Sequence, residues 1–473
     1  MKNLIYIILI LSLNLFSQYE WSTPLKLSGN GTYPGNFYSD TAIVLDHNNT
    51  IYAFWINHIE TGKFEWYSQI ELRKSYDLGI TWSPIENITP EITTGRAFKI
   101  EAVCDSLNNI HIVYQYYSSC VYKKFDGVSW SQPIVISNNL YSTLRLGIDN
   151  SDLLYATWYC LGYSCFSYCD ARADSIKWSE YEKISDENNF IYSNYVFDSD
   201  NSLYAGGSNA DTNKPCFFKY DKTLKKWSYD VICDNPFWPT GLILINDEIF
   251  YSVVTAAIPY SSDSGTFLIS KSFNDSLWSS QIRINDNDYR ELKSFHYDSE
   301  RNLHLFESYN YDYIYSKMLS STQEWFCNTV QSDLNYIYDN ERVYFDKRSN
   351  MFYSIHEKYE ISTNNSWIYF QSKLNETGIE SDNVLPLATE LYQNYPNPFN
   401  PATNIKFSLS KSGKVELSVY NIAGQLVRRL VDKEMSAGFH SVKFEADNLN
   451  SGMYFYKLKA NGKELTKKML MVK

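Results

Sequence analysis

Seven copies of a short tryptophan segment dominate this sequence. Six copies begin Trp-Ser and the last begins Trp-Phe, and an aliphatic or small polar residue follows after four or five variable positions. Successive tryptophans are 61, 48, 48, 49, 51 and 47 residues apart. A fixed period near 50 residues, built from strand-like units, is typical of the blades of a β-propeller. The copies begin at Trp21, Trp82, Trp130, Trp178, Trp227, Trp278 and Trp325.

A second repeat lies between the tryptophans and reads as two short apolar strands joined by a turn. Asp and Asn start tight turns because their side chains bond the nearby backbone, so each copy predicts a β-hairpin. A third apolar segment then precedes each later tryptophan, and we expect the tryptophan to begin a fourth strand. The turn residues are Asp46, Asp105, Asp149, Asp198, Asn246, Asp298 and Asp346.

The two ends of the repeat array complement each other. The last third-strand segment starts at Ser366 with no tryptophan repeat after it, whereas Trp21 stands before the first hairpin. Residues 21–28 are therefore expected to supply the outer strand of the last blade, which protects the sheet edges. The predicted fold is all-β: a seven-bladed β-propeller over residues 18–375, closed by its N-terminal strand, then an Ig-like β-sandwich. An open β-array or a pair of sandwiches is the alternative.

Residues 1–17 have the pattern of a secretory signal peptide. Lys2 gives a positive start, residues 4–13 are almost wholly apolar, and Ser17 is a small residue at a suitable cleavage position. This run is too short for a spanning helix, although an N-terminal membrane anchor is the alternative. No other run of about 18 apolar residues exists, so we expect no membrane-spanning segment in the mature chain.

Charge is spread unevenly along the chain, whose net charge is −12. From residue 385 onward, 13 Lys and Arg face 7 Asp and Glu, so this end carries +6 and the rest carries −18. An acidic body repels the phosphate backbone, so no nucleic-acid partner is expected.

All eight cysteines lie before the C-terminal segment, and export permits disulfides. Cys160 and Cys165 flank the short loop LGYS, where a cross-strand bridge is conceivable, but the connectivity stays open. Together with Cys169 they lack CxxC spacing and a histidine neighbour, which disfavours a zinc site.

One turn before a tryptophan has an unusually regular sequence. It reads Ser75-Tyr-Asp77-Leu-Gly79-Ile-Thr81-Trp82 and resembles the Asp-box of the sialidase-like (BNR-repeat) propellers. The Asp carboxylate can accept bonds from turn amides, and the glycine can take a positive φ. The resemblance implies a structural turn on the face opposite any catalytic centre, within a propeller spanning residues 18–375.

The repeat stops after Asn375. Residues 376–390 have the composition of a linker, and residues 391–473 contain short strands with turns every 8–12 residues, which suggests an Ig-like sandwich. Three proline positions close together, Pro396, Pro398 and Pro401, exclude a helix at its start.

This segment resembles the type A C-terminal sorting domain of the type IX secretion system. The resemblance covers residues 385–473 and rests on YQNYPNPFNP at 392–401, VYNIAG at 419–424, AGFH at 437–440 and SGMYFY at 451–456. It implies export through the periplasm of a Gram-negative bacterium, recognition by the outer-membrane translocon, and release or attachment at the cell surface. An ordinary Ig-like accessory domain is the alternative.

Loops that enter the first strand and loops that join the second to the third strand share one face of a propeller. That face is rich in aromatic, carboxylate and arginine side chains. Aromatic faces stack on sugar rings, and charged groups fix hydroxyls and uronates, so the leading hypothesis is a glycan ligand. The candidate ligand-binding residues are Trp66, Arg96, Arg145, Trp238, Arg290, Arg342, His356 and Glu357.

Catalysis remains open at this stage. A sialidase needs three arginines around a carboxylate, but the four arginines lie 9, 4, 8 and 4 residues before their turn residues and are not equivalent. The family's N-terminal Arg-Ile-Pro motif is absent, and its ring has six blades, so sialidase activity is disfavoured. A glycoside hydrolase needs two paired carboxylates; the candidates are Glu65, Glu307 and Glu357. A lyase could use His58 or His356 as its base.

Three functions therefore compete. The first is a secreted or surface-exposed binding propeller, the second a polysaccharide-degrading enzyme, and the third a non-catalytic structural surface protein. No cofactor is expected. Asp286 and Asp288 could bind Ca²⁺, although a solvated turn is the favoured interpretation.

Overall fold

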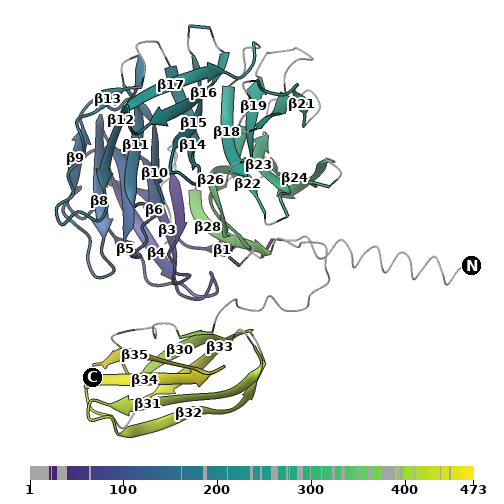
Figure 1. Ribbon diagram of the computed structural model, residues 1–473. Helices are drawn as coiled ribbons and strands as arrows, with labels where there is room; N and C mark the ends of the chain where they lie inside the picture. The colour runs from purple at the N-terminus through teal and green to yellow at the C-terminus, as the bar shows by residue number, and fades with distance from the viewer. Residues whose placement is uncertain are drawn as a thin grey trace, which may run out of the picture.

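The protein is described from a computed structural model (Figure 1). The described residues are 21–22, 24–28, 40–62, 65–160, 162–184, 189–209, 211–212, 214–234, 238–245, 248–256, 265–272, 275, 277–284, 291–298, 300–309, 312–321, 325–331, 336–346, 348–349, 351–360, 365–374, 389–391, 394, 397, 399–409, 411–436, 438–446 and 449–472. The predicted signal peptide lies outside them. Within them, no helix is long and apolar enough to cross a membrane.

Twenty-eight strands of the described chain form seven antiparallel sheets of four strands each, here named sheet 1 to sheet 7. Each sheet takes consecutive strands, except that sheet 7 pairs three late strands with the first strand of the chain. The strands of sheets 1 to 4 are β2 (Thr41–Leu45), β3 (Ile51–Gly62), β4 (Glu65–Ser75) and β5 (Glu86–Asn87); β6 (Ala97–Cys104), β7 (Ile110–Tyr116), β8 (Ser119–Phe125) and β9 (Ile134–Ser137); β10 (Ser142–Ile148), β11 (Leu153–Cys160), β12 (Tyr163–Asp170) and β13 (Glu182–Lys183); β14 (Asn189–Phe197), β15 (Leu203–Asn209), β16 (Lys214–Asp221) and β17 (Lys226–Val231). Those of sheets 5 to 7 are β18 (Trp238–Ile245), β19 (Ile249–Ala256), β20 (Gly265–Ser272) and β21 (Ile282–Arg283); β22 (Glu291–Tyr297), β23 (Leu303–Tyr309), β24 (Asp312–Met318) and β25 (Trp325–Gln331); β26 (Tyr336–Asp346), β27 (Met351–Glu360), β28 (Asn365–Leu374) and β1 (Leu25–Lys26).

The first strands of the seven sheets contact one another in a closed cycle. Each contacts the first strand of the next sheet, in the order β2, β6, β10, β14, β18, β22, β26, and β26 contacts β2 again. These strands therefore surround a common axis, and the outer strands fan away from it in the upper body of Figure 1. Apolar side chains of adjacent sheets fill the space between them, which accounts for the separate core clusters.

The hairpin turns follow from the Asp repeat. In the first sheet, Oδ1 of Asp46 accepts the amides of Asn48 and Thr50, at 2.9 and 2.7 Å, and Asn49 takes a φ of +62°. Asn tolerates this left-handed conformation, and the arrangement is a type I turn followed by a left-handed residue. The residues with positive φ at the same place in other hairpins are Asn108, Asp152, Asn201 and Arg301.

Most outer strands begin later than the sequence predicts. We expected each tryptophan to start the fourth strand, but β5 begins four residues after Trp82. The serine beside the tryptophan explains the difference. Ser83 donates its amide to the carbonyl of Lys74, at 2.8 Å, and its hydroxyl accepts the amide of Lys74, at 2.9 Å. One residue therefore satisfies both backbone groups of its neighbour, as a regular strand pair would.

The same serine contacts recur at Ser131, Ser179 and Ser279, where the hydroxyl accepts an amide from the third strand at 3.0–3.1 Å. Ser22 makes the same contact to Ser372, at 3.0 Å. The Trp-Ser pair is thus a hydrogen-bonded attachment of the outer segment to its sheet.

Each repeated tryptophan with a described ring contact packs against an aromatic ring of the preceding sheet. The ring of Trp130 lies 6.1 Å from Phe54 in sheet 1, and Trp82 in sheet 1 lies 4.8 Å from Phe370 in sheet 7. The tryptophans therefore stabilise the sheet-to-sheet contacts around the axis. The remaining pairs are Trp178–Tyr122, Trp227–Phe166, Trp278–Phe217 and Trp21–Phe306, at 5.2–5.9 Å.

The N-terminal segment completes sheet 7, as expected from the missing last tryptophan. β1 pairs with β28, with Leu25 opposite Phe370, and the amide of Leu27 donates to the carbonyl of Ile368 at 2.7 Å. Leu27 is fully buried between sheets 7 and 1. The hairpin turns that join the first and second strands lie on one side of the sheets, here called the hairpin-turn side. There, the guanidinium of Arg348 donates to the carbonyl of Asp46 at 3.1 Å, which joins sheet 7 to sheet 1 a second time.

Two hairpin neighbours in sheet 3 are covalently linked. Cys160 and Cys165 form a disulfide across the tight β11–β12 turn, which is the bridge that the sequence made conceivable.

The C-terminal strands form two sheets in a smaller body (Figure 1). One holds β29 (Glu390–Leu391), β30 (Ala402–Leu409) and β33 (Gly438–Glu445); the other holds β31 (Gly413–Asn421), β32 (Leu426–Met435), β34 (Gly452–Ala460) and β35 (Lys463–Met471). Alternate residues of both sheets face a shared apolar core that includes Phe407, Leu417 and Leu458.

Candidate functional site

A charged cluster lies on the strands that surround the axis. Arg145 in β10, Arg342 in β26 and Glu101 in β6 each stand four residues before the Asp of their hairpin turn. Nη1 of Arg145 lies 3.0 Å from Oε1 of Glu101, and Nη2 of Arg342 lies 3.4 Å from the same oxygen. Equivalent positions on three sheets therefore come together, with the two arginines at the carboxylate of Glu101.

Asp40 and Lys99 extend this cluster. Oδ1 of Asp40 lies 3.4 Å from Nη2 of Arg342 and 4.0 Å from the ammonium of Lys99. The other oxygen of Asp40 accepts the amide of Ile100 at 3.0 Å, which fixes the carboxylate between sheets 1 and 2. We name these five residues, Asp40, Lys99, Glu101, Arg145 and Arg342, the axial charge cluster.

The axial charge cluster is partly open to solvent. The side chains of Arg145 and Arg342 are 25% and 28% exposed, whereas the side chain of Asp40 is 5% exposed. Three cations and two carboxylates leave one positive charge in excess. Partly desolvated guanidinium groups bind carboxylates and other planar anions well because their donors match the geometry of such groups.

Sequence reasoning found only part of this cluster. It identified Arg145 and Arg342 but treated the arginines as non-equivalent, and it missed Glu101, Asp40 and Lys99. The detectable signal is the position four residues before the turn Asp, which carries Glu101, Arg145 and Arg342 in sheets 2, 3 and 7.

The other predicted ligand residues are not among the five residues of this cluster. Arg96 directly precedes β6, and its carbonyl accepts the amide of Tyr117 at 3.1 Å. Arg290 lies outside the described residues, as do Asp286 and Asp288. Trp66 lies in β4 and Trp238 begins β18, and the structure describes the backbone alone at both.

His356 and Glu357 do not lie in a loop, as the sequence suggested, but inside β27. The strand continues to Glu360, so both residues lie within it, and both side chains are buried. The ring of His356 stacks on Tyr369 at 6.1 Å, and burial lowers the pKa of His356 to about 3. Such a histidine stays neutral and is a weak base, which argues against a role in proton abstraction from a polymer.

The remaining catalytic candidates are also inside strands. Nδ1 of His58 lies 2.8 Å from the hydroxyl of Ser68. Glu307 is fully buried and accepts the hydroxyl of Thr266 at 2.9 Å. Glu65 begins β4, where only the backbone is described.

Glu71 is a carboxylate that the sequence did not single out. Its oxygens accept Nε1 of Trp55 at 2.8 Å and Nδ2 of Asn57 at 2.7 Å. Burial raises the pKa of Glu71, and these two hydrogen bonds only partly offset that rise. A carboxyl group in this state is suited to donate a proton.

The hairpin-turn side holds two buried hydrogen-bonded chains. In sheet 2, Nε2 of His111 lies 3.1 Å from Oδ2 of Asp105, and Nδ1 lies 2.7 Å from the hydroxyl of Tyr122. An ionised carboxylate can only accept, so Nε2 carries the proton and Nδ1 accepts the tyrosine hydroxyl. Burial lowers the pKa of His111. Burial alone would raise the pKa of Asp105, but hydrogen bonds from His111 and Asn109 bring it to about 2.

Sheet 6 repeats this arrangement. His304 contacts Asp298 at 3.1 Å and the hydroxyl of Tyr315 at 2.7 Å, and burial lowers its pKa. In sheets 3 and 4 a tyrosine takes the histidine's place and donates directly to the turn Asp, as Tyr155 does to Asp149 at 2.9 Å. The repeated position identifies these chains as part of the scaffold.

The turn with the regular sequence is held by its own side chains. Asp77 accepts the amide and hydroxyl of Thr81 at 2.8 and 2.6 Å, and Ser75 donates to Asp77 at 2.7 Å. Gly79 has a φ of +94°, and Nε1 of Trp82 donates to its carbonyl at 3.1 Å. The polar side chains of Ser75, Asp77, Thr81 and Trp82 therefore form hydrogen bonds within the turn itself.

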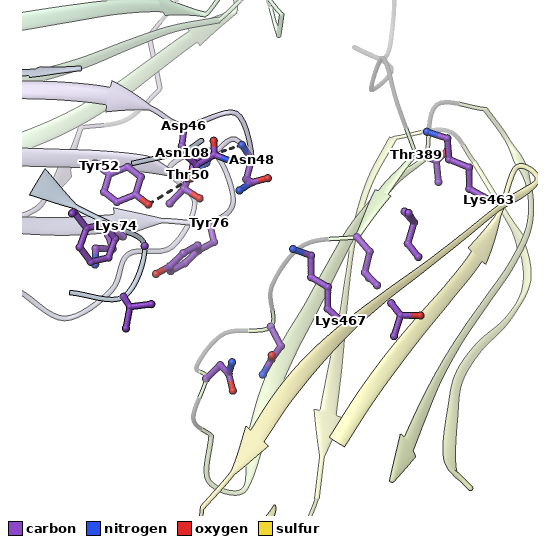
Figure 2. A pocket seen from close by; sticks show the side chains of 18 residues that line it. Asp46, Asn48, Thr50, Tyr52, Lys74, Tyr76, Asn108, Thr389, Lys463 and Lys467 are labelled. Atoms are coloured by element: carbon purple, nitrogen blue, oxygen red, sulfur yellow. Dashed lines mark hydrogen bonds between the residues drawn. The ribbon is translucent and has the colours of Figure 1, made fainter. Parts of the chain in front are cut away.

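A pocket lies between the turns of sheets 1 and 2 and strand β35 (Figure 2). Asp46 and Tyr76 line it from one side and Lys463 and Lys467 from the other. No predicted ligand residue lines it. Across the described residues, no group of three His, Cys, Asp or Glu side chains could hold a metal ion.

Comparison with solved structures supports a propeller fold. A polysaccharide lyase, Uly1, superposes with a TM-score of 0.51 at 8% identity, covering 76% of this chain and 98% of that one. A protein of unknown function from Dyadobacter fermentans gives 0.49 at 9% identity, covering 76% and 100%. A leech intramolecular trans-sialidase gives 0.42 at 10% identity, covering 74% and 70%. At these identities the likeness concerns the fold alone. No curated protein matches the sequence.

The C-terminal body matches a known family over most of its length. The family of secretion system C-terminal sorting domains matches residues 393–473, which include all the strands of this body except β29. Such a domain directs export to the cell surface or the medium of a Gram-negative bacterium. Residues 393–473 therefore belong to the C-terminal sorting domains of the type IX secretion system, on a chain whose larger part is built of seven four-stranded antiparallel sheets.

Proposed function

We propose that residues 18–375 form a closed seven-bladed propeller that binds an acidic glycan outside the cell. Residues 376–390 would be its linker, and residues 391–473 an Ig-like sandwich that is needed for export only. The cyclic contacts of the first strands and the pairing of β1 with β28 support the ring.

The axial charge cluster is the observation that carries the ligand proposal. Arg145 and Arg342 come from sheets 3 and 7 and meet at Glu101, and both side chains are about a quarter exposed. A ligand carboxylate can approach the exposed parts of the two arginine side chains, while Glu101 accepts sugar hydroxyls. The single excess positive charge favours an acidic saccharide over a neutral one.

A glycan array with the mature chain tests this proposal. The wild-type protein is expected to bind uronate- or sialate-containing glycans, and the double variant Arg145→Gln/Arg342→Gln is expected to lose that binding. Arg301→Gln is the matched control because its partner, Glu248, is an exposed residue away from the cluster. Equal binding by the double variant and the wild type would refute the assignment of the ligand to this cluster.

A polysaccharide-degrading enzyme is the second candidate. The fold similarity to a polysaccharide lyase and the raised pKa of Glu71 favour it. Incubation with acidic polysaccharides would then release unsaturated uronates or new reducing ends, and Glu71→Gln would abolish the release. Binding without turnover supports the first function. If the chain shows neither binding nor turnover, the third candidate, a structural surface protein, remains.

The candidates Trp66, Trp238 and Arg290 stay proposed as further ligand contacts. His356 and Glu357 are buried inside β27, and the proposal does not depend on them.

The sorting domain gives an independent test of export. Deletion of residues 385–473 is expected to leave the chain in the periplasm, which fractionation detects directly. Normal export of the truncated chain would contradict recognition through this domain.

A further inference from the structure

Among the described residues, the strongly exposed aromatic rings come from sheets 2 and 3. The chain has 41 Tyr, 26 Phe and 12 Trp, and most of those with described side chains are buried or half-buried between sheets. Within the described residues, four aromatic side chains are strongly exposed, and all four come from residues 98–181. They are Phe98 at 39%, Tyr117 at 55%, Tyr141 at 53% and Tyr181 at 41%.

Backbone contacts bring the loops that carry these rings together. Tyr117 donates its amide to the carbonyl of Arg96, two residues before Phe98, at 3.1 Å. The next residue, Ser118, accepts the amide of Leu140 at 2.7 Å, which places Tyr141 beside the same turn. We name Phe98, Tyr117, Tyr141 and Tyr181 the aromatic platform, which follows the seam between sheets 2 and 3.

Tyr181 joins the platform from the outer segment of sheet 3. Its hydroxyl accepts Nδ2 of Asn139 at 3.4 Å, and Asn139 lies two residues before Tyr141. Its ring packs against the buried ring of Trp158 at 6.0 Å. Tyr181 therefore has a fixed position although its surface is open.

The ring of Tyr117 is also held in place. Gly95 has a φ of +81°, and a Cβ atom at that position would lie 2.2 Å from the tyrosine ring. The ring of Tyr116 packs edge-on against the ring of Tyr117, with 4.9 Å between their centroids, and the hydroxyl of Tyr116 donates to the carbonyl of Thr94 at 2.8 Å. A ring that is exposed but already ordered loses little conformational entropy when a ligand covers it.

The chemistry of the platform matches sugar rings. The electron-rich face of an aromatic ring attracts the C–H groups on the apolar face of a pyranose, and tyrosine adds a hydroxyl at its edge. Polar groups beside the rings can bond sugar hydroxyls, among them Ser119 and Asn138, which contact each other at 2.9 Å. The platform differs in this from the turns that precede the tryptophans, where the most exposed apolar side chains of sheets 1, 2, 4 and 5 are aliphatic: Ile80, Val128, Leu224 and Leu277.

The platform leads toward the axial charge cluster. Phe98 is adjacent in sequence to Lys99, whose ammonium contacts Asp40 at 4.0 Å. Sheets 2 and 3, which carry the platform, also supply Glu101 and Arg145 to the cluster. A chain of several sugars can therefore lie over the rings with one acidic unit at the cluster, whereas a single sugar could occupy only one of the two.

We infer that the aromatic platform is a binding site for an extended glycan chain, stacking at least two pyranose rings on Tyr117 and Tyr141. This inference rests on the proposed glycan-binding function and specifies its ligand as a polymer. It makes Phe98, Tyr117, Tyr141 and Tyr181 binding residues that act together with the charged end of the site.

Affinity electrophoresis of the mature chain tests the inference. The gels contain laminarin, xyloglucan, dextran, alginate or polygalacturonate. Tyr117→Ala and Tyr141→Ala are each expected to weaken retardation by the bound polysaccharide about ten-fold or more, as loss of a stacking anchor does. Leu277→Ala is the control because this apolar side chain is also exposed, at 79%, but lies in a turn of sheet 5. All three positions are exposed, so the folded state is retained, which thermal melting confirms.

The outcomes separate this inference from the proposed function. Loss of binding in the tyrosine variants supports the platform, whatever the arginine variants do. Full binding by both tyrosine variants, with loss only in Arg145→Gln/Arg342→Gln, overturns the platform and keeps the proposed function. If no polysaccharide of the panel retards the wild-type chain, the platform is not a glycan site and the inference is wrong.

Discussion

Substitution of Leu27 by Ala tests whether the N-terminal strand closes the ring. Leu27 is fully buried in the cluster that joins sheets 7 and 1, whereas Leu25, two residues earlier, is 41% exposed. Leu27→Ala removes about three buried carbon groups, worth about 0.8 kcal/mol each, and leaves a cavity. The expected loss in the free energy of unfolding is about 2–5 kcal/mol. Leu25→Ala, the matched control, should change it by about 0.5 kcal/mol or less.

Urea unfolding followed by tryptophan fluorescence measures this loss. All 12 tryptophans lie between residues 21 and 367, so the signal does not report on the sorting domain. If the ring is closed, the whole unfolding transition of Leu27→Ala moves to a lower urea concentration. An unchanged main transition, with only a small early step, would show that the array is open and refute the reasoning.

Three further predictions concern the scaffold. Gly79→Ala should destabilise the chain by about 1–3 kcal/mol more than Gly127→Ala, since both have positive φ but only the first would place Cβ 2.2 Å from a phenyl ring; thermal melting compares them. Arg348→Ala should cost about 1.5–3 kcal/mol in urea unfolding, because it removes charged hydrogen bonds between sheets 7 and 1. Stability should fall as pH drops below about 6.5, because burial lowers the pKa of His111 and His304 and only the unfolded chain takes up protons there; unfolding midpoints at each pH measure this.

Each of these predictions has a contradicting result. Equal melting temperatures for the two glycine variants would mean that packing against sheet 7 is loose. For the arginine, Arg301→Ala is the control, since its exposed pair should contribute about 0–1 kcal/mol, and equal losses would deny the closing role. An unfolding midpoint that stays constant between about pH 7 and 5 would contradict the histidine account.

The repeated features of this fold could be predicted from the sequence. Hairpin turns at Asp46 and its equivalents, and the pairing of residues 21–28 with the last sheet, follow from patterns that recur once per sheet. The starts of the outer strands could not, because the hydroxyl of Ser83 replaces strand pairing and delays β5. A side chain that imitates a backbone acceptor leaves no trace in hydrophobic periodicity.

The candidate site was only partly predictable because it does not repeat. Arg145 and Arg342 were identified, but their meeting at Glu101 depends on which sheets surround the axis. His356 was predicted to lie in a loop, but the ten-residue strand β27 extends through this position. The exposure of Tyr117 was invisible in a chain with 41 tyrosines, since sequence does not tell which rings the neighbouring sheets cover.

The salt dependence of binding tests the central claim, that an acidic glycan binds at the axial charge cluster. Isothermal titration of the mature chain with its acidic glycan at increasing sodium chloride should show Kd rising steadily, because ions screen the attraction to Arg145 and Arg342. Arg145→Gln/Arg342→Gln should bind more weakly and with little salt dependence. A Kd that does not change with salt, or an equal salt dependence in the double variant, would contradict the account.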